Sequence, residues 1–295
     1  MSAAAHSRRS SRPRLLVAAN GDGDSVGALH LAAEFARRDG ASVLVVGVAE
    51  RLPASVTAIP RAKPFAPNEQ ERLMMLDEIH RAVRRVRGAE RWEKRAVLGT
   101  PADVVIAVAE REKASLVLVG LRHRGRLRRI FGGETTVPLM RHSRVPILAV
   151  PATVRAIPKR VVVGIDFSVA SSAAALIAAG LASRGGVITL AHASSLAGYP
   201  ARPGDLADLY RAGARAKLDM MARELKGARQ RIETALIDGE PGDALLTSAR
   251  KHRCDLIALG GPEQGLAERV LLGSVRTRVV REARCSVLVV PLRAK

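Results

Sequence analysis

Short apolar runs alternate with longer amphipathic segments along most of the chain, and the pattern is clearest in the second half. Residues 160–165 (RVVVGI), 255–260 (DLIALG) and 286–290 (SVLVV) are nearly continuous aliphatic runs, which is typical of strands buried on both faces. Residues 186–192 (GVITLAH) and 231–237 (RIETALI) predict two more strands. The second half is therefore expected to contain five strands.

The segments between these strands carry helix signals. Ser168 stands at an N-cap position before 169–183, and the segment 205–227 is long and amphipathic. Further helices are expected after GEPGD (239–243) and from about Ser274. Strands joined by helical crossovers form a parallel sheet with helices on both faces. The pattern therefore predicts an α/β fold with a doubly wound, five-stranded parallel sheet.

The first half repeats this pattern. At an offset of 140 residues, 103–120 (DVVIAVAEREKASLVLVG) matches 243–260 (DALLTSARKHRCDLIALG), and SRVPILAVP, ending at Pro151, matches RCSVLVVP, ending at Pro291. Residues 14–25 (RLLVAANGDGDS) match 160–171 (RVVVGIDFSVAS) at a slightly larger offset. We therefore predict two tandem domains of the same fold, at 14–151 and 160–292. A linker is expected at 152–159 and a disordered basic tail at 1–13.

The ends of the first and fourth strands mark the candidate site of each domain. Open parallel sheets bind ligands beyond the carboxyl ends of their strands, where the strand order reverses. In the second half those ends are Asp166 and Gly260, and the loop after Gly260 leads to Gly273, Ser274 and a helix. Glycines let backbone N–H groups approach phosphate oxygens, and a helix N-terminus adds partial positive charge. The candidate ligand therefore carries phosphate.

With these motifs in place, the sequence resembles the universal stress protein family in its tandem two-domain form. The resemblance rests on VVVGIDFS (161–168), GEPGDALLTSARKHRCDLIALGG (239–261) and LLGSVRTRVVREARCSVLVVP (271–291), and it covers nearly all of the chain after residue 13. It implies adenine-nucleotide alpha-hydrolase-like domains with strand order 3-2-1-4-5. It also implies an intramolecular pseudo-dimer, paired through the last strand of each domain, and leaves association into a homodimer open.

The family includes members that bind ATP and members that do not. The binding members carry G-x2-G-x9-G-[S/T] after the fourth strand and an aspartate after the first. By this resemblance Asp166 would hold the adenine or ribose, the Ala193 backbone would meet the adenine edge, and Gly260 would begin the phosphate loop. The residues implied to bind ATP with Mg²⁺ are Gly164, Asp166, Ala193, Gly260, Gly261, Gly273, Ser274 and Val275.

Both halves depart from the family pattern. In the second half Glu263 stands where the second glycine would fall, and its carboxylate costs space and charge unless it turns outward or meets a metal ion. In the first half Asn20 replaces the aspartate, His123 replaces the second glycine, and Glu134 replaces the serine after the third. Glu134 would put negative charge where phosphate belongs. The first half is therefore expected to be degenerate as an ATP site.

The net charge of +20 adds a second candidate partner. It is spread over both halves, with 26 Lys and Arg against 15 Asp and Glu in residues 1–150 and 22 against 13 in the rest. A dedicated nucleic-acid module concentrates its charge and often carries stacking aromatics, which are only 2% here. The cluster Arg122–Arg129 is either a polyanion grip or a solvated basic loop. Some affinity for polyanions is expected in both cases.

Other classes of protein lack support in the sequence. The two cysteines, Cys254 and Cys285, fit a reducing compartment and are interpreted as inert thiols. No apolar run reaches the roughly 20 residues of a membrane span, and the N-terminus does not resemble a secretory signal, so a cytoplasmic location is expected. The histidines lack metal-ligand spacing, so no metal site is predicted, and no Walker loop or G-x-S-x-G elbow occurs.

The leading hypothesis is a non-enzymatic, cytosolic stress-response protein with an ATP site in its C-terminal half. An alternative is a basic interaction protein that does not bind nucleotide and contacts nucleic acid or an acidic protein partner. A third hypothesis, a nucleotide-dependent enzyme, lacks a catalytic constellation.

Overall fold

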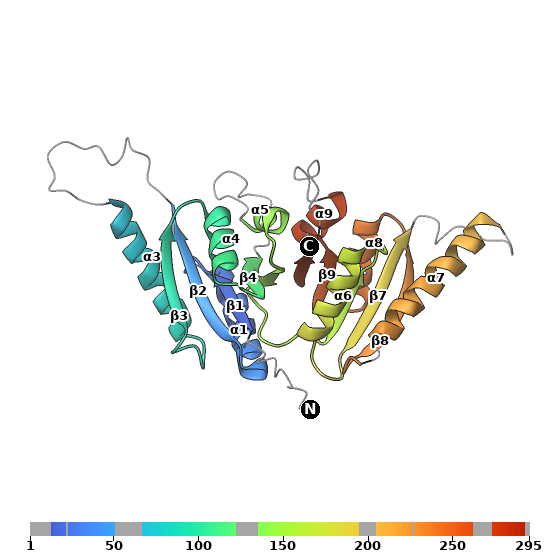
Figure 1. Ribbon diagram of the computed structural model, residues 1–295, viewed down its shortest axis with the longest axis horizontal. Helices are drawn as coiled ribbons and strands as arrows, with labels where there is room; N and C mark the ends of the chain where they lie inside the picture. The colour runs from blue at the N-terminus through green and yellow to red at the C-terminus, as the bar shows by residue number, and fades with distance from the viewer. Residues whose placement is uncertain are drawn as a thin grey trace, which may run out of the picture.

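The computed structural model describes residues 13–21, 23–50, 67–121, 135–194, 205–225, 227–261 and 273–292. Within these ranges the strands form one ten-stranded sheet (Figure 1). The strands of the first half are β1 (Arg14–Ala18), β2 (Ser42–Ala49), β3 (Glu93–Leu98), β4 (Leu116–Leu121) and β5 (Ile147–Pro151). Those of the second half are β6 (Arg160–Gly164), β7 (Val187–Ser194), β8 (Arg231–Asp238), β9 (Leu256–Gly260) and β10 (Ser286–Val290).

The strand order confirms the predicted fold of both halves. It runs β3-β2-β1-β4-β5-β10-β9-β6-β7-β8, so each half has the order 3-2-1-4-5 with parallel neighbours. The two sheets join where β10 pairs with β5 in antiparallel register, with Leu288 opposite Leu148. The chain is therefore an intramolecular pseudo-dimer, paired through the last strand of each half.

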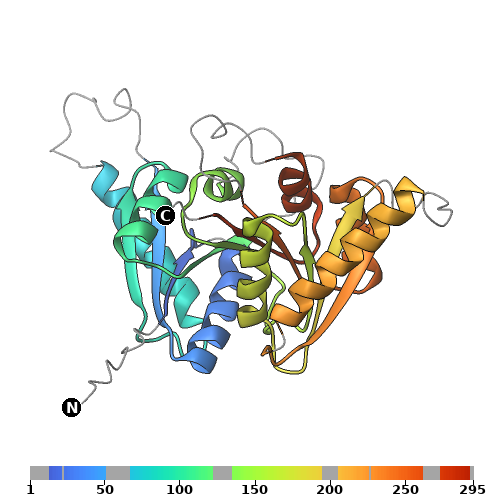
Figure 2. The same ribbon diagram turned by 45° about the vertical axis from the view of Figure 1, so that its right-hand side comes forward.

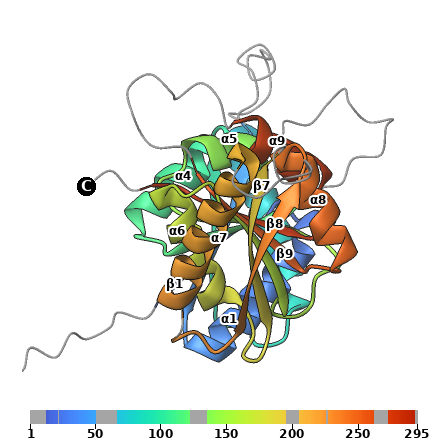
Figure 3. The ribbon, with the colours of Figure 1, turned by 90° about the vertical axis from the view of Figure 1, so that its right-hand side faces the viewer.

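Two layers of helices cover the sheet. One layer contains α1 (Val26–Asp39), α3 (Pro67–Arg84), α6 (Val169–Leu181) and α7 (Leu206–Glu224); the other contains α4 (Pro101–Arg111), α5 (Thr136–His142), α8 (Pro241–Lys251) and α9 (Ser274–Glu282). Figure 3 shows α6 and α7 on one side of the strands and α8 on the other. Each layer buries one aliphatic cluster that continues across both halves. A core with few aromatic side chains is therefore built from Val, Leu, Ile and Ala.

Local signals place most of these elements where the sequence predicts them. Ser168 is the N-cap of α6, and its side chain accepts a hydrogen bond from the backbone N–H of Ser171. The short 3₁₀ helix η1 (Gly23–Ser25) directly precedes α1. The start of α8 differs from the prediction: the helix begins inside GEPGD, at Pro241, since proline favours the first helical position.

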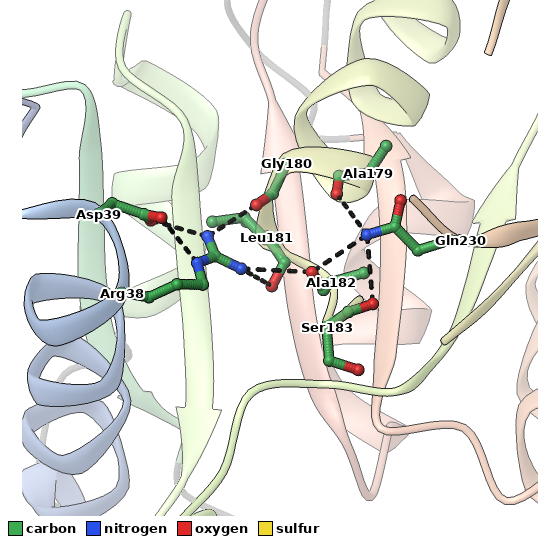
Figure 4. A network of polar contacts seen from close by, with 8 residues as sticks. All are labelled: Arg38, Asp39, Ala179, Gly180, Leu181, Ala182, Ser183 and Gln230. Atoms are coloured by element: carbon green, nitrogen blue, oxygen red, sulfur yellow. Dashed lines mark hydrogen bonds and ion pairs between the residues drawn. The ribbon is translucent and has the colours of Figure 1, made fainter. Parts of the chain in front are cut away.

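Side-chain hydrogen bonds join the halves at the C-terminal end of α6, which stands beside α1 (Figure 2). The Arg38 guanidinium, on α1, donates to the carbonyl oxygens of Gly180 at 2.7 Å and Ala182 at 3.2 Å, and it also pairs with Asp39 (Figure 4). The Gln230 amide donates to three carbonyls of the same region, those of Ala179, Ala182 and Ser183. These donors satisfy the carbonyls that a helix end leaves unpaired.

Several predicted features lie outside the described residues. They are the tail at 1–12, the cluster Arg122–Arg129 with His123, Glu134, and Glu263 in the phosphate loop. In the part of the chain that the structure describes, no helix is both long and apolar enough to cross a membrane.

Candidate functional site

The carboxyl ends of β6, β7 and β9 meet at one edge of the sheet, because Gly164 of β6 pairs with Ala191 on one side and Leu259 on the other. Asp166 follows β6 at this edge and is exposed. Its Oδ1 accepts hydrogen bonds from the Ser168 backbone N–H at 3.0 Å and from the Ser168 hydroxyl at 2.5 Å. The sequence-predicted aspartate is therefore held in a fixed orientation at the strand end.

The charge of Asp166 follows from its surroundings. Partial burial raises the pKa of this carboxyl, but hydrogen bonds from Ser168 and Ser171 lower it more, so the pKa lies below its ordinary value. Asp166 is therefore an ionised acceptor at neutral pH. A ribose hydroxyl or an adenine amino group could donate to such a carboxylate.

Phe167 adopts a left-handed backbone conformation, with φ at 63°. This conformation costs a non-glycine residue conformational free energy, and residues under such strain are concentrated at functional sites. The centroid of the Phe167 ring lies 4.5 Å from that of the His192 ring. The Lys217 ammonium lies over the Phe167 ring, 5.2 Å from its centroid. The first half has Gly21 at the equivalent position, also left-handed at 74°.

His192, near the end of β7, connects the first strand end to α7. Its Nδ1 lies 2.7 Å from the carbonyl oxygen of Ile165, so Nδ1 donates, because a carbonyl only accepts. Its Nε2 lies 2.6 Å from the hydroxyl of Tyr210, on α7. The histidine is half-buried and both ring nitrogens have partners. It fixes the residue directly before Asp166.

The N-terminus of α9 lies at the end of β9. Gly273 is its N-cap, with φ at 77°, and the first helical residue, Ser274, is exposed. The Arg276 Nε donates to the carbonyl oxygen of Gly260 at 2.6 Å, which fastens the first turn of α9 to the strand end. The first backbone N–H groups of a helix have no acceptor within that helix. Here they stand beside a guanidinium, in a position that suits an anion.

Three glycines of the predicted site are required by packing. A Cβ on Gly260 would lie 2.7 Å from the backbone of Ala170 and Ser171, and one on Gly261 would lie 2.7 Å from the Cα of Pro291. A Cβ on Gly164 would meet the side chains of Leu259 and Leu245 at 2.8 and 2.9 Å. These glycines let the sheet, α6 and α8 approach one another closely. Their presence is therefore explained without a ligand.

Ala193 lies inside β7, opposite Ile237 of β8, whereas the sequence places it just after the strand. It stands two residues beyond the last β6–β7 pair, on the side of the strand that contributes Ala191 to the cluster under α8 and α9. Val275 is half-buried in the first turn of α9. Of the eight predicted residues, Asp166, Ala193, Gly273, Ser274 and Val275 thus stand where a ligand at the sheet edge could meet them.

Sequence reasoning missed the side chains that support this edge, which are Phe167, Tyr210, Lys217 and Arg276. Comparing the two halves residue by residue would have flagged two of them. Lys217 stands where the first half has Glu78, which lies over Gly21, and Arg276 stands where it has Thr136. The second half therefore has two cations at positions where the first half has a carboxylate and a hydroxyl.

Metal ligation has no support among the described residues, where no group of three or more His, Cys, Asp or Glu side chains could hold an ion. The two cysteines lie away from this edge, at the opposite ends of β9 and β10.

Together, the fold and this edge define a doubly wound α/β protein with two tandem domains and a candidate anion-binding edge in the second. The model of the universal stress protein family matches residues 12–151 and 158–291. The chain therefore belongs to the universal stress protein family, as its sequence motifs indicate.

Solved structures and curated relatives agree with this assignment. A universal stress protein from Archaeoglobus fulgidus has a TM-score of 0.68 at 18% identity, over 94% of this chain and 98% of that one. A putative universal stress protein from Pseudomonas aeruginosa has a TM-score of 0.60 at 16% identity, over 96% and 94%. A universal stress protein of Methanocaldococcus jannaschii is 42% identical over 60 residues, which are 20% of this chain and 35% of that relative. The match spans about a third of that relative's length.

Proposed function

We propose that this protein is a non-enzymatic, cytoplasmic stress-response protein whose C-terminal half binds one adenine nucleotide. The observation that carries the proposal is the meeting of Asp166 and the N-terminus of α9 at one sheet edge, with Arg276 between the strand end and the helix. An ionised carboxylate suits the hydroxyls of a ribose, and the helix N-terminus with its cation suits phosphates. ATP, with Mg²⁺ on its phosphates, fits this combination.

The electrostatics of the two halves support one site rather than two. The second half has Asp166, Lys217 and Arg276 at positions that Asn20, Glu78 and Thr136 occupy in the first. In the first half, the Glu78 carboxylate repels phosphate. The neutral Thr136 hydroxyl attracts phosphate less strongly than the Arg276 guanidinium does in the second half. The first half is accordingly proposed to have lost nucleotide binding while keeping the fold.

Calorimetric titration with ATP and Mg²⁺ tests the proposal, using variants that copy the first half into the second. Asp166→Asn copies Asn20, and Ser274→Glu copies Glu134. Each should weaken binding at least tenfold, because a charged hydrogen bond is worth about 1.5–3 kcal/mol and a carboxylate at the helix N-terminus competes with phosphate. Asn20→Ala is the matched control and should leave the affinity unchanged.

A saturable heat at one ATP per chain is the expected result for the unmutated protein. No saturable heat, or two equivalent sites, would reject the proposal. Salt-dependent retention of nucleic acid, lost when Arg122–Arg129 are neutralised, would instead favour the alternative of a basic interaction protein. The net charge of +20 is the observation behind that alternative.

A further inference from the structure

Two cysteines lie together at the base of the C-terminal half, at the end of the sheet opposite the candidate nucleotide site. Cys254 precedes β9 and Cys285 precedes β10, and both side chains are half-buried. They line one cavity of about 160 Å³ and pack against the same aliphatic cluster beneath α8 and α9. The two thiols therefore lie on the same face of the sheet and share one space.

The strand register brings the chain segments that carry the two cysteines side by side. Ser286 pairs with Leu256, and the Ser286 N–H donates to the carbonyl of Asp255 at 3.1 Å, which is the hydrogen bond of this parallel pair. Cys285 directly precedes Ser286, and Cys254 lies two residues before Leu256. Neighbouring strands lie about 4.8 Å apart, and both cysteine side chains pack against one cluster and line one cavity. Disulfides span Cα separations of roughly 4.4–6.8 Å.

The first half provides an internal comparison for this pair. At the equivalent positions it has Ala114 and Val145, both fully buried. The backbone is the same in the two halves, since the Cys254 N–H donates to the Ala249 carbonyl at 2.8 Å and the Ala114 N–H to the Ala109 carbonyl at 2.9 Å. Packing at these positions is therefore satisfied by alanine and valine, and it does not require sulfur.

We propose that Cys254 and Cys285 form a dithiol site that a peroxide oxidises to an intrachain disulfide. The Cys254 thiolate attacks one peroxide oxygen, the O–O bond breaks, and a sulfenic acid forms as hydroxide leaves. The Cys285 thiolate then attacks the Cys254 sulfur, the S–O bond breaks, and hydroxide leaves and takes a proton from solvent to become water. Two electrons from the two sulfurs reduce one peroxide, and the proposal does not depend on nucleotide binding.

The surroundings make this oxidation slow at neutral pH. Burial raises the pKa of Cys254 to about 11 and that of Cys285 to about 12, and the charge of Cys254 also raises the pKa of Cys285. The charged groups that line the cavity or act on the thiols are Arg160, Arg250, Arg253, Asp255, Glu282 and Arg284. Because the thiolate is the reactive form, the site responds to sustained oxidation rather than to brief exposure.

The test treats the full chain with hydrogen peroxide, blocks free thiols under denaturing conditions, and identifies cross-linked peptides by mass spectrometry without reduction. The expected product is a Cys254–Cys285 link within one chain, with the loss of two hydrogens. Its initial rate should rise about tenfold per pH unit between pH 7 and 10, because both thiols are mostly protonated throughout that range.

The double variant Cys254→Ala with Cys285→Val copies the first half, so it should fold and form no cross-link. Each single variant should also lose the cross-link, while its remaining thiol becomes a sulfenic acid. Disulfides found only between chains would overturn the proposal. So would two cysteines that stay reduced and unlinked, or that are oxidised to sulfonic acids without forming a disulfide.

Discussion

The two halves of this chain share a backbone and differ in the chemistry they carry at the carboxyl edge of the sheet. Gly120 and Gly260 both lie where a helix start crosses the fourth strand, and a Cβ would come within 2.6–2.7 Å of backbone atoms at each. Lys113 and Arg253 both adopt left-handed conformations after the preceding helix, with φ at 50° and 48°. Thr136 and Arg276 both donate to the carbonyl of that glycine. The framework was therefore kept after the halves diverged.

The differences fall on side chains that face the edge. The second half has an aspartate fixed by Ser168 and a left-handed phenylalanine whose ring makes a tilted contact with the His192 ring, where the first has Asn20 and a glycine. Strain is retained only where the surrounding contacts compensate for it. A glycine shared by both halves indicates the fold, whereas a residue present in one half alone indicates that half's function.

The largest predicted effect tests the shared framework. Gly260→Ala and Gly120→Ala should each destabilise the protein by about 3 kcal/mol, because the added methyl group meets backbone that cannot rotate away. Gly180→Ala, in α6 with no atom near its added Cβ, is the matched control and should be neutral or slightly stabilising. Urea unfolding followed by circular dichroism measures all three. A neutral Gly120→Ala would mean that the first glycine of the motif is not a packing requirement.

The next effect concerns the contact between the halves. Arg38→Ala should cost about 1–2 kcal/mol, because it removes a cation and several donors from the C-terminal carbonyls of α6. Arg37→Ala is the control, since Arg37 pairs with Glu34 on the exposed side of α1. Hydrogen exchange should accelerate in residues 179–186 of the Arg38 variant, although the substitution lies in the other half. Acceleration confined to α1 would contradict a role in joining the halves.

The sequence predicts the framework well because its signals are local or repeated. The β-branched runs, the N-cap at Ser168 and the 140-residue offset each depend on a few neighbouring residues, and the strand order follows from the family resemblance. The pseudo-dimer, the parallel sheets and the position of α9 all agree with the structure.

The site is less predictable because its supports are distant in sequence. His192 of β7 meets the Ile165 carbonyl across 27 residues, and Tyr210 meets His192 from α7. The sequence near Phe167 does not predict a left-handed backbone, because that conformation is usually adopted by glycine. The orientation of Glu263 lies outside the described residues. The resemblance implies that Gly260 binds nucleotide, and the structure adds a packing reason for glycine at that position.

The smallest effect separates capping from charge at the candidate site. Ser168→Ala removes the N-cap of α6 and the hydroxyl that donates to Asp166, so it should cost about 1 kcal/mol at neutral pH. The lowered pKa of Asp166 adds stability above its ordinary value of 3.8, and this stability is lost as the pH falls through the lowered pKa. Without the Ser168 hydroxyl, the pKa of Asp166 moves upward, toward that ordinary value.

The difference in unfolding free energy between the unmutated protein and Ser168→Ala should therefore have its full value above about pH 4. It should decrease in more acidic solution, where only the N-cap contributes. Ser172→Ala is the matched control, because in the described part of the structure the Ser172 hydroxyl donates to the Ser168 carbonyl and not to Asp166. The effect of this substitution on stability should not change with pH. Unfolding free energies measured from pH 7 to pH 2 distinguish the two variants. Parallel curves for all three proteins would show that Ser168 acts on α6 alone and does not hold Asp166 as an ionised ligand group.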